Sequence, residues 1–181
     1  MRWSLSNRGS DGARALADRH YNRRKIGAAM FTPPGRPVVL RCPRALWVSI
    51  WNKPEYVDHE WPGAWLNSTF RNEGAGLSSE LIAEACAATR WLWGEPPHVV
   101  RAVPWAPVSM ITFIDPAKVR HKRDPGRCYL RAGFVEVGAT QGGHGRNPLI
   151  VLALPTEKYP PPIAPLSAQF SLFRSSERVT C

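Results

Sequence analysis

Long apolar segments are missing from this sequence. No window approaches the roughly 18 uninterrupted apolar residues that a membrane-spanning helix requires. The opening stretch, MRWSLSNRGSDG, has an early positive charge but neither the apolar run nor the small-residue cleavage site of a secretory signal. We therefore expect a soluble, cytoplasmic protein that does not contact membranes.

Cysteine is scarce, and its spacing is irregular. The four cysteines include no CxxC pair, which argues against a zinc ribbon or a disulfide framework. Cys86 falls in a helical apolar pattern and is expected in the core. No two-histidine metal motif occurs either.

Acidic residues are too few to balance the basic ones. The chain has 24 Lys and Arg against 14 Asp and Glu, a formal net charge of +10 and a pI near 10.1. A domain this basic commonly binds nucleic acid or another polyanion, although charge alone identifies no partner.

Length and apolar content set the domain organisation. With 181 residues, of which 44% are hydrophobic, the chain can bury one full core but not two. Three consecutive prolines follow Tyr159. We predict one domain over 1–159 and a proline-rich C-terminal tail over 160–181 that wraps the domain or extends from it.

Apolar periodicity predicts a mixed α/β (α+β) fold. Residues 37–51 are typical of an antiparallel hairpin that turns at 42–44. Strands are also predicted over 64–72, 108–115 and 147–155, and 128–138 indicates a short helix that leads into a strand. The strongest helical pattern runs from 77 to 93, with Ser78 or Ser79 as N-cap and Gly94 at its end.

A glycine-rich segment, RNEGAG, occupies 71–76 directly before the long helix. Two glycines at a helix N-terminus allow backbone N–H groups to face an anion, with the helix dipole adding favourable potential. A pyrophosphate fits such a loop. A glycine-rich turn without a ligand is the alternative interpretation.

This loop resembles the R/Q-x-x-G-x-G/A motif of the GNAT acyltransferase superfamily, which binds the pyrophosphate of acetyl-coenzyme A. Further on, YLRAGFVEVG is similar to the GNAT signature in which a tyrosine, here Tyr129, lies near the coenzyme A sulfur. The resemblance implies a GNAT-like, mostly antiparallel central sheet flanked by helices. The cofactor-binding residues it implies are Phe70, Arg71, Gly74, Ala75, Gly76, Leu77 and Ser78.

Between Asp115 and Tyr129, the regular helix of ordinary acetyltransferases is replaced by a basic segment, DPAKVRHKRDPGRC. Its prolines and glycine interrupt a helix, and its cations either form a solvated face or border the active site. Cations beside a cleft would bind a phosphodiester backbone. The cations are Lys118, Arg120, Lys122, Arg123 and Arg127.

The stretches RHYNRR and MFTPPGRPVVL resemble the N-terminal signature of the Mom family of phage DNA-modification proteins, over about residues 15–155. These GNAT-related enzymes convert the N6 amine of adenine to a carbamoylmethyl derivative, which protects phage DNA from restriction. The resemblance implies acetyl-coenzyme A or a related acyl donor, DNA with a flipped or single-stranded adenine, and host cytoplasm as the location. The catalytic residues it implies are His20, Tyr21, Asp115 and Tyr129, with Arg19, Arg23, Arg24 and Lys25 on DNA phosphates.

The family is associated with iron, for which His20 and Asp115 are the candidate ligands. His59 and Glu60 are alternative general bases, or surface residues. Of the tryptophans, Trp47, Trp65, Trp91 and Trp93 fit core positions, and Trp51, Trp61 or Trp105 fit base stacking.

Two other functions remain open at this point. A conventional GNAT N-acetyltransferase acting on a protein or small-molecule amine accounts for the glycine loop and Tyr129 but not for the basic segments. A non-enzymatic nucleic-acid-binding domain accounts for the charge alone.

Overall fold

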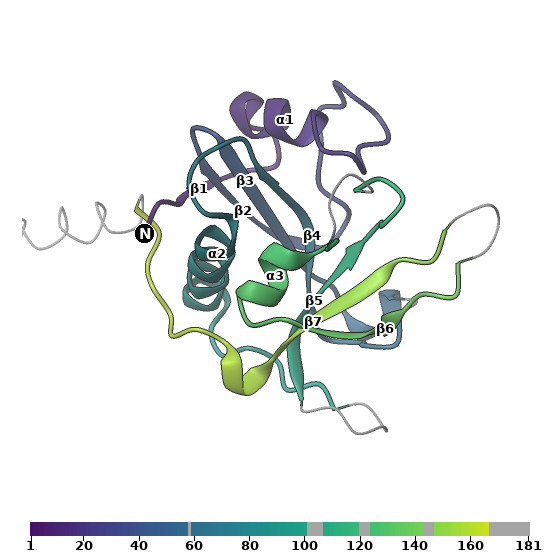
Figure 1. Cartoon of the computed structure of the whole chain (residues 1–181). Coiled ribbons are helices and arrows are strands. Elements are labelled where there is room, and N and C mark those ends of the chain that lie inside the picture. Colours follow the sequence, from purple (N-terminus) through teal and green to yellow (C-terminus); the bar gives the residue numbers. More distant parts are fainter. Residues whose placement is uncertain (58, 101–106, 120–123, 143–146, 167–181) are drawn as a thin grey trace, which may run out of the picture.

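The computed structural model describes residues 1–166 apart from 58, 101–106, 120–123 and 143–146. Three α-helices, a 7-stranded sheet and two short 3-10 helices, Pro54–Tyr56 and Thr156–Lys158, form this part of the chain (Figure 1). The strands are β1 (Ser4–Ser6), β2 (Arg36–Cys42), β3 (Ala45–Trp51), β4 (Trp65–Asn72), β5 (Val108–Ile114), β6 (Val135–Ala139) and β7 (Ile150–Pro155), and the helices are α1 (Asp11–Asp18), α2 (Ser78–Trp93) and α3 (Arg127–Arg131).

The strand order is β1-β2-β3-β4-β5-β7-β6. Each neighbouring pair is antiparallel except β4 and β5, which are parallel because α2 carries the chain across the sheet between them. This mixed, mostly antiparallel sheet flanked by helices confirms the predicted α/β (α+β) fold class.

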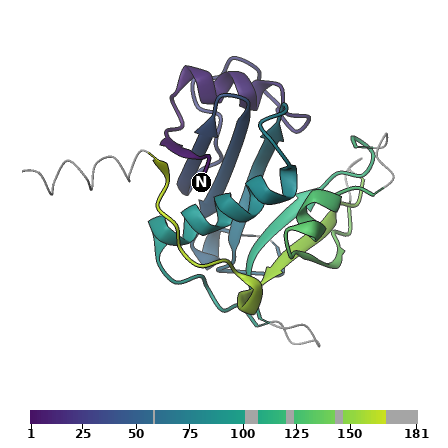
Figure 2. The ribbon, with the colours of Figure 1, turned by 60° about the vertical axis from the view of Figure 1, so that its left-hand side comes forward.

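The sheet is covered on both faces. Alternate residues of β2 point to opposite sides, so Val38 and Leu40 pack with α2, whereas Val39 packs with α1. Helix α3 contacts α2 and lies on the same face of the sheet (Figure 2). Trp47 and Trp65 are fully buried under α2, as predicted, and so is Cys86.

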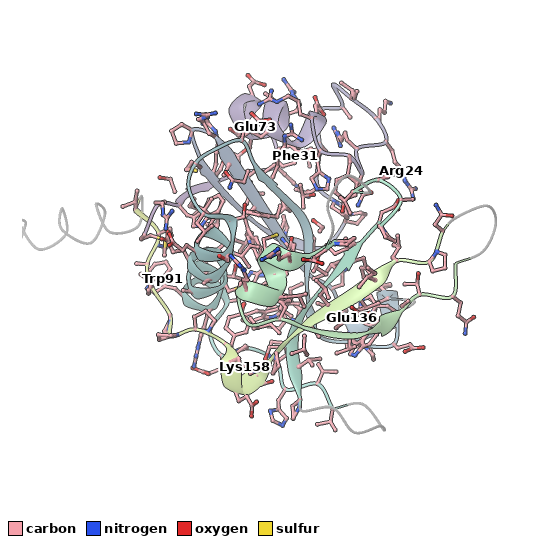
Figure 3. The ribbon with its side chains drawn as sticks, in the orientation of Figure 1. Arg24, Phe31, Glu73, Trp91, Glu136 and Lys158 are labelled. Carbon is pink, nitrogen blue, oxygen red and sulfur yellow. The ribbon has the colours of Figure 1, made fainter. Side chains whose placement is uncertain are left out.

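Two local predictions are wrong. Leu77, and not Ser78 or Ser79, is the N-cap of α2, with no side-chain capping bond. Ser78 Oγ instead accepts a hydrogen bond of 2.8 Å from Asn72 Nδ2. Trp91 was expected in the core but is 40% exposed and lies on the outer side of α2 (Figure 3). The buried residues of α2 lie between Leu81 and Thr89, and Trp91 lies in the last turn beyond them.

Strand β1 was not predicted, because three residues are too few to show an alternating pattern. The described part of the tail packs on the domain: the Ile163 N–H donates to Ala87 O at 3.2 Å, and the Leu166 N–H donates to Trp3 O at 2.9 Å. None of the described helices is long and apolar enough to cross a membrane.

Candidate functional site

A cavity of about 550 Å³ opens where β4 and β5 part. These parallel strands pair only over 65–67 and 110–112, although β4 continues to Asn72 and β5 to Ile114. A bulge at Ser68 adds local twist, since Val48 pairs with Thr69 and Ser49 with Asn67. The carboxyl ends of parallel strands are a common place for ligand sites.

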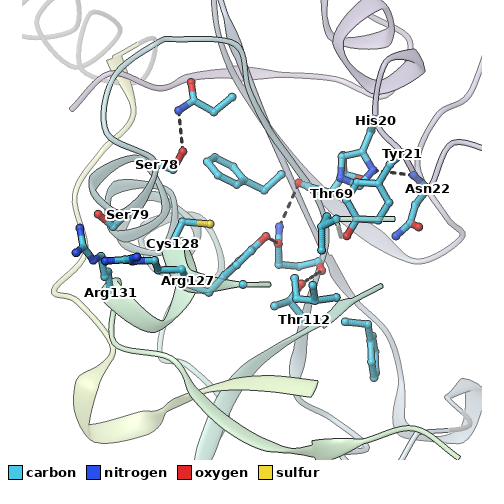
Figure 4. Close-up of a pocket in the computed structure, with 18 of the residues that line it drawn as sticks. His20, Tyr21, Asn22, Thr69, Ser78, Ser79, Thr112, Arg127, Cys128 and Arg131 are labelled. Carbon is cyan, nitrogen blue, oxygen red and sulfur yellow. Dashed lines mark hydrogen bonds between the residues drawn. The ribbon is translucent and has the colours of Figure 1, made fainter. Parts of the chain in front are cut away.

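Segments distant in sequence meet at this cavity (Figure 4). Its walls come from 20–22, the outer half of β4, the start of α2, the end of β5, and α3. The sequence-predicted residues that line it are His20, Tyr21, Phe70, Gly76, Leu77, Ser78, Arg127 and Tyr129. Asp115, Arg71, Gly74 and Ala75 are not among the lining residues.

Tyr129 reaches the cavity from α3 and is only 5% exposed. Its hydroxyl donates a hydrogen bond of 2.5 Å to Asn67 Oδ1 on β4. The Asn67 amide nitrogen donates to the carbonyls of Val48, at 2.9 Å, and Thr69, at 3.2 Å, which holds the amide oxygen toward Tyr129. Burial raises the pKa of Tyr129 well above its ordinary value, so the hydroxyl keeps its proton at neutral pH.

His20 and Tyr21 form a stacked pair, with ring centroids 4.4 Å apart and ring planes inclined by 29°. His20 Nδ1 accepts a hydrogen bond of 3.3 Å from the backbone N–H of Asn22. Burial, together with the positive charges of Arg71 and Lys118, lowers the pKa of His20 to about 4. The imidazole is therefore neutral at physiological pH, and the pair presents uncharged aromatic surface to the cavity.

We expect thermal stability to fall as the pH drops from about 6.5 toward 4, and part of this fall to come from His20. The folded chain keeps His20 neutral down to a pKa of about 4, whereas an unfolded histidine takes up a proton near 6.5. Protonation then favours the unfolded state in this interval. Melting temperatures of wild type and His20→Gln from pH 7.5 to 4 test this: the variant should lose less. Equal losses would contradict a buried, neutral imidazole.

The glycine loop is partly closed by a side chain. Gly74 and Gly76 have φ of 90° and 138°, a region that favours glycine. Asn72 Oδ1 accepts from the backbone N–H groups of Gly74, at 3.0 Å, and Ala75, at 2.8 Å. The first turn of α2, which begins after Leu77, has no side-chain cap. A phosphate therefore fits the first turn of α2 better than the amides over Gly74.

Arg71 does not face the cavity. It pairs with Glu73 at 2.6 Å and also donates to the backbone carbonyl of Arg19. Arg19 in turn donates to both oxygens of Glu73, at 2.7 and 2.8 Å. The two arginines lower the pKa of Glu73 to about 2. This network ties the His20–Tyr21 segment to the end of β4.

Two arginines that the sequence did not single out flank the glycine loop instead. A Cβ on Gly76 would collide with a guanidinium nitrogen of Arg2, and a Cβ on Gly74 would lie 3.1 Å from one of Arg44. Arg2 also pairs with Glu80 at 2.6 Å and with Glu84 at 2.9 Å. Neither arginine belongs to a local motif, so only the fold brings them here.

The cations predicted to contact DNA phosphates differ in whether a carboxylate pairs with them. Arg24 and Lys25 are exposed, and the described residues place no carboxylate within ion-pair distance of either. Arg23 is largely buried and pairs with Asp18 at 2.7 Å. Arg127 pairs with Asp124 at 3.3 Å. The predictions for Arg120, Lys122, Arg123 and Trp105 lie outside the described residues.

Asp115 follows β5 and lies beside Tyr21, whose pKa is raised mainly by burial. Its Oδ1 accepts from the backbone N–H groups of Ala117, at 3.1 Å, and Lys118, at 3.3 Å. Within the described ranges, no three His, Cys, Asp or Glu side chains gather as metal ligands. The assignment of His20 and Asp115 as iron ligands stays a prediction.

The other candidates do not reach the cavity. His59 and Glu60 are not lining residues, and His59 Nδ1 accepts from the Trp61 N–H at 3.2 Å. Trp61 is 5% exposed and belongs to the core, not to a stacking surface. Trp51 packs edge to face on Trp65, with ring centroids 6.0 Å apart.

The sequence did not single out several lining residues, among them Asn67, Thr112, Cys128 and Arg131. The one available signal was Asn67, an amide in a strand pattern, where a buried polar side chain needs a partner. Thr112 Oγ1 donates to the Asn67 backbone carbonyl at 3.1 Å, across the last paired position of β4 and β5.

No family profile matches the sequence, and no curated protein matches it. Three similar solved structures are of aminoglycoside acetyltransferase AAC(6')-Ib: with paromomycin and acetyl-coenzyme A, with coenzyme A and kanamycin, and with ribostamycin and coenzyme A. Identities are 17%, 18% and 19%, each alignment covers 68% of this chain, and the TM-score is 0.43 in each case. The alignments cover 66%, 67% and 65% of those chains, so the first spans just under two thirds of its neighbour.

Proposed function

We propose that this chain is an acyl-coenzyme A-dependent transferase that modifies the N6 amine of adenine in DNA. The observation that carries the proposal is one cavity that joins Tyr129, the stacked His20–Tyr21 pair and the first turn of α2. These three elements lie far apart along the chain, and each contributes lining residues to this cavity. The wall at α2 suits the donor, and the wall at His20 suits the acceptor.

The acyl donor would bind with its pyrophosphate at the start of α2. Gly76 has a positive φ and lines the cavity, and Leu77 leaves the helix amides uncapped by any side chain. The Arg2 guanidinium lies next to Gly76 but is paired with Glu80 and Glu84. The start of α2 fits a diphosphate, because its backbone N–H groups and the helix dipole favour negative charge.

Tyr129 is suited to handle the proton of the reaction. In its resting hydrogen bond the hydroxyl donates to Asn67, so its oxygen is available to accept from an amine in the cavity. Because the pKa of Tyr129 is raised, the hydroxyl remains protonated. In an acyl transfer, where an amine attacks the thioester carbonyl and the C–S bond breaks, rotation of the O–H away from Asn67 would deliver a proton to the departing thiolate.

The acceptor is proposed to be an extruded adenine. A stacked adenine is inaccessible, so the base must leave the duplex or the strand must be single. His20 and Tyr21 offer it a neutral aromatic wall, and Arg24 and Lys25 lie just beyond them with exposed charge for phosphates. The Mom resemblance suggests carbamoylmethyl as the group added. Its N6–CH2 bond replaces a C–H bond of the acetyl methyl, so this product requires a two-electron oxidant and an amide-nitrogen donor in addition to acetyl-coenzyme A.

Nucleoside mass spectrometry tests the proposal. DNA from bacteria that express the chain should contain a deoxyadenosine heavier by one carbamoylmethyl group in place of hydrogen. Expression of Tyr129→Phe should leave the DNA unmodified, whereas Tyr159→Phe, a buried tyrosine away from the cavity, should behave as wild type.

Other outcomes point to the other functions. Unmodified DNA together with acetylated small or protein amines would identify a conventional N-acetyltransferase. Unmodified DNA together with tight DNA binding and no binding of coenzyme A would identify a non-enzymatic DNA-binding domain.

A further inference from the structure

A short loop, residues 22–28, leaves the cavity wall directly after Tyr21. It begins with tight turns, because the His20 N–H donates to Ala17 O and the Arg23 N–H donates to His20 O, both at 2.9 Å. These turns fix the start of the loop relative to His20, so the loop stays close to the cavity.

Asp18, the last residue of α1, closes the loop from beneath. One carboxylate oxygen accepts from Arg23 Nε at 2.7 Å, and the other accepts from the Gly27 N–H at 3.0 Å. Arg23 Nη2 also donates to Ala28 O at 3.3 Å. We call the Asp18 carboxylate with its hydrogen bonds to Arg23 and Gly27 the Asp18 clamp. The bonds from Gly27 and Arg23 lower the pKa of Asp18, so the carboxylate stays ionised and the clamp stays formed at neutral pH.

The clamp displays three consecutive side chains, those of Arg24, Lys25 and Ile26. Ile26 is 75% exposed, the highest value among the exposed large hydrophobic residues of the described chain. The chain reverses at Gly27, whose φ is 74° and whose surroundings are open, with nothing within 4 Å of the place that a Cβ would take. Arg24 projects from the edge of the molecule (Figure 3). Folding gains nothing from an apolar side chain held out in water.

We propose that loop 22–28 holds duplex DNA, with Arg24 and Lys25 on phosphates and Ile26 inserted into the base stack where the adenine has left. This inference rests on the proposed function, since it assumes that DNA is the partner. The inference adds loop 22–28 as the element that extrudes the adenine and Ile26 as the residue that takes its place in the stack.

The physical argument comes from the cost of extrusion. A base that leaves the duplex forfeits stacking, and an apolar wedge that enters the gap restores part of that stacking. The wedge must be rigidly supported, apolar and flanked by cations that pin the backbone. Loop 22–28 combines the Asp18 clamp, Ile26 and the Arg24–Lys25 pair within a few residues of the cavity wall.

Two measurements on the full chain test the inference. The first measures the fluorescence of duplexes in which 2-aminopurine replaces one adenine, because the emission of 2-aminopurine rises when this base unstacks. The set of duplexes covers every combination of neighbouring bases. Wild type should raise the emission, and Ile26→Ser should reduce this rise by roughly tenfold. Ile163→Ser is the matched control, an exposed isoleucine (43%) on the tail beside α2, and should behave as wild type.

The second measurement is duplex binding by fluorescence anisotropy across salt concentrations. Ile26→Ser should keep the salt dependence of wild type, whereas Arg24→Gln with Lys25→Gln should lower the slope by roughly one for each phosphate that is no longer neutralised. Ile26 is exposed, so its substitution should leave the melting temperature unchanged and the comparison valid.

The outcomes separate the wedge from the enzyme. A fluorescence response unchanged in Ile26→Ser, or absent in a wild type that nevertheless modifies DNA, would overturn the wedge and leave the proposed function intact. A wild type that neither binds nor modifies DNA would overturn both.

Discussion

Tyr129→Phe is expected to lower DNA modification by about 10²- to 10⁴-fold, the range that a positioned acid–base group contributes. The substitution removes only the hydroxyl oxygen, which donates to Asn67 Oδ1 at 2.5 Å in the cavity wall. The ring keeps its edge-to-face contact with Phe134, with centroids 5.2 Å apart. The reaction should therefore fail while the donor and DNA still bind.

The same substitution should also reduce stability, because Asn67 Oδ1 is left buried without its donor. Such a loss costs about 1–3 kcal/mol. Rates of modified nucleoside formation, coenzyme A binding by calorimetry and urea unfolding separate the two effects. Full activity in Tyr129→Phe would remove the hydroxyl from the chemistry, whatever its effect on stability.

Trp65→Ala is expected to cost about 3–5 kcal/mol of unfolding free energy, the usual range for large aromatic side chains in a core. Trp65 is 0% exposed. Its ring lies 5.0 Å from that of Trp93 and 5.6 Å from that of Tyr159, between the sheet, α2 and the start of the tail. A domain of this kind has about 5–15 kcal/mol in total, so the variant should be marginal.

Urea unfolding followed by circular dichroism measures this loss. Trp91→Ala is the matched control: it removes the same side chain from an exposed position on α2 and should cost less than about 1 kcal/mol. Comparable losses in the two variants would show that Trp65 does not hold the core together.

Local features of the fold were predictable because they depend on neighbours in the chain. The hairpin of β2 and β3, the long helix α2 and the glycine turn before it each leave a periodic or glycine signal over a few residues. The predictions for Ser78 and Trp91 were wrong because their residue types fit more than one environment. Ser78 is a good cap by type but bonds to Asn72, and Trp91 is apolar by type but lies beyond the buried part of α2.

The candidate site depends both on local sequence features and on contacts between distant segments. The sequence alone determined that a glycine loop precedes a helix, that Tyr129 follows a basic segment, and that a His-Tyr pair lies among cations. Only the tertiary structure decided that these meet, because the parting of the parallel strands β4 and β5 brings residues 62 apart, Asn67 and Tyr129, into one hydrogen bond. It also decided that Arg71 binds Glu73 and not the cavity, since contacts between distant segments leave no pattern in the chain.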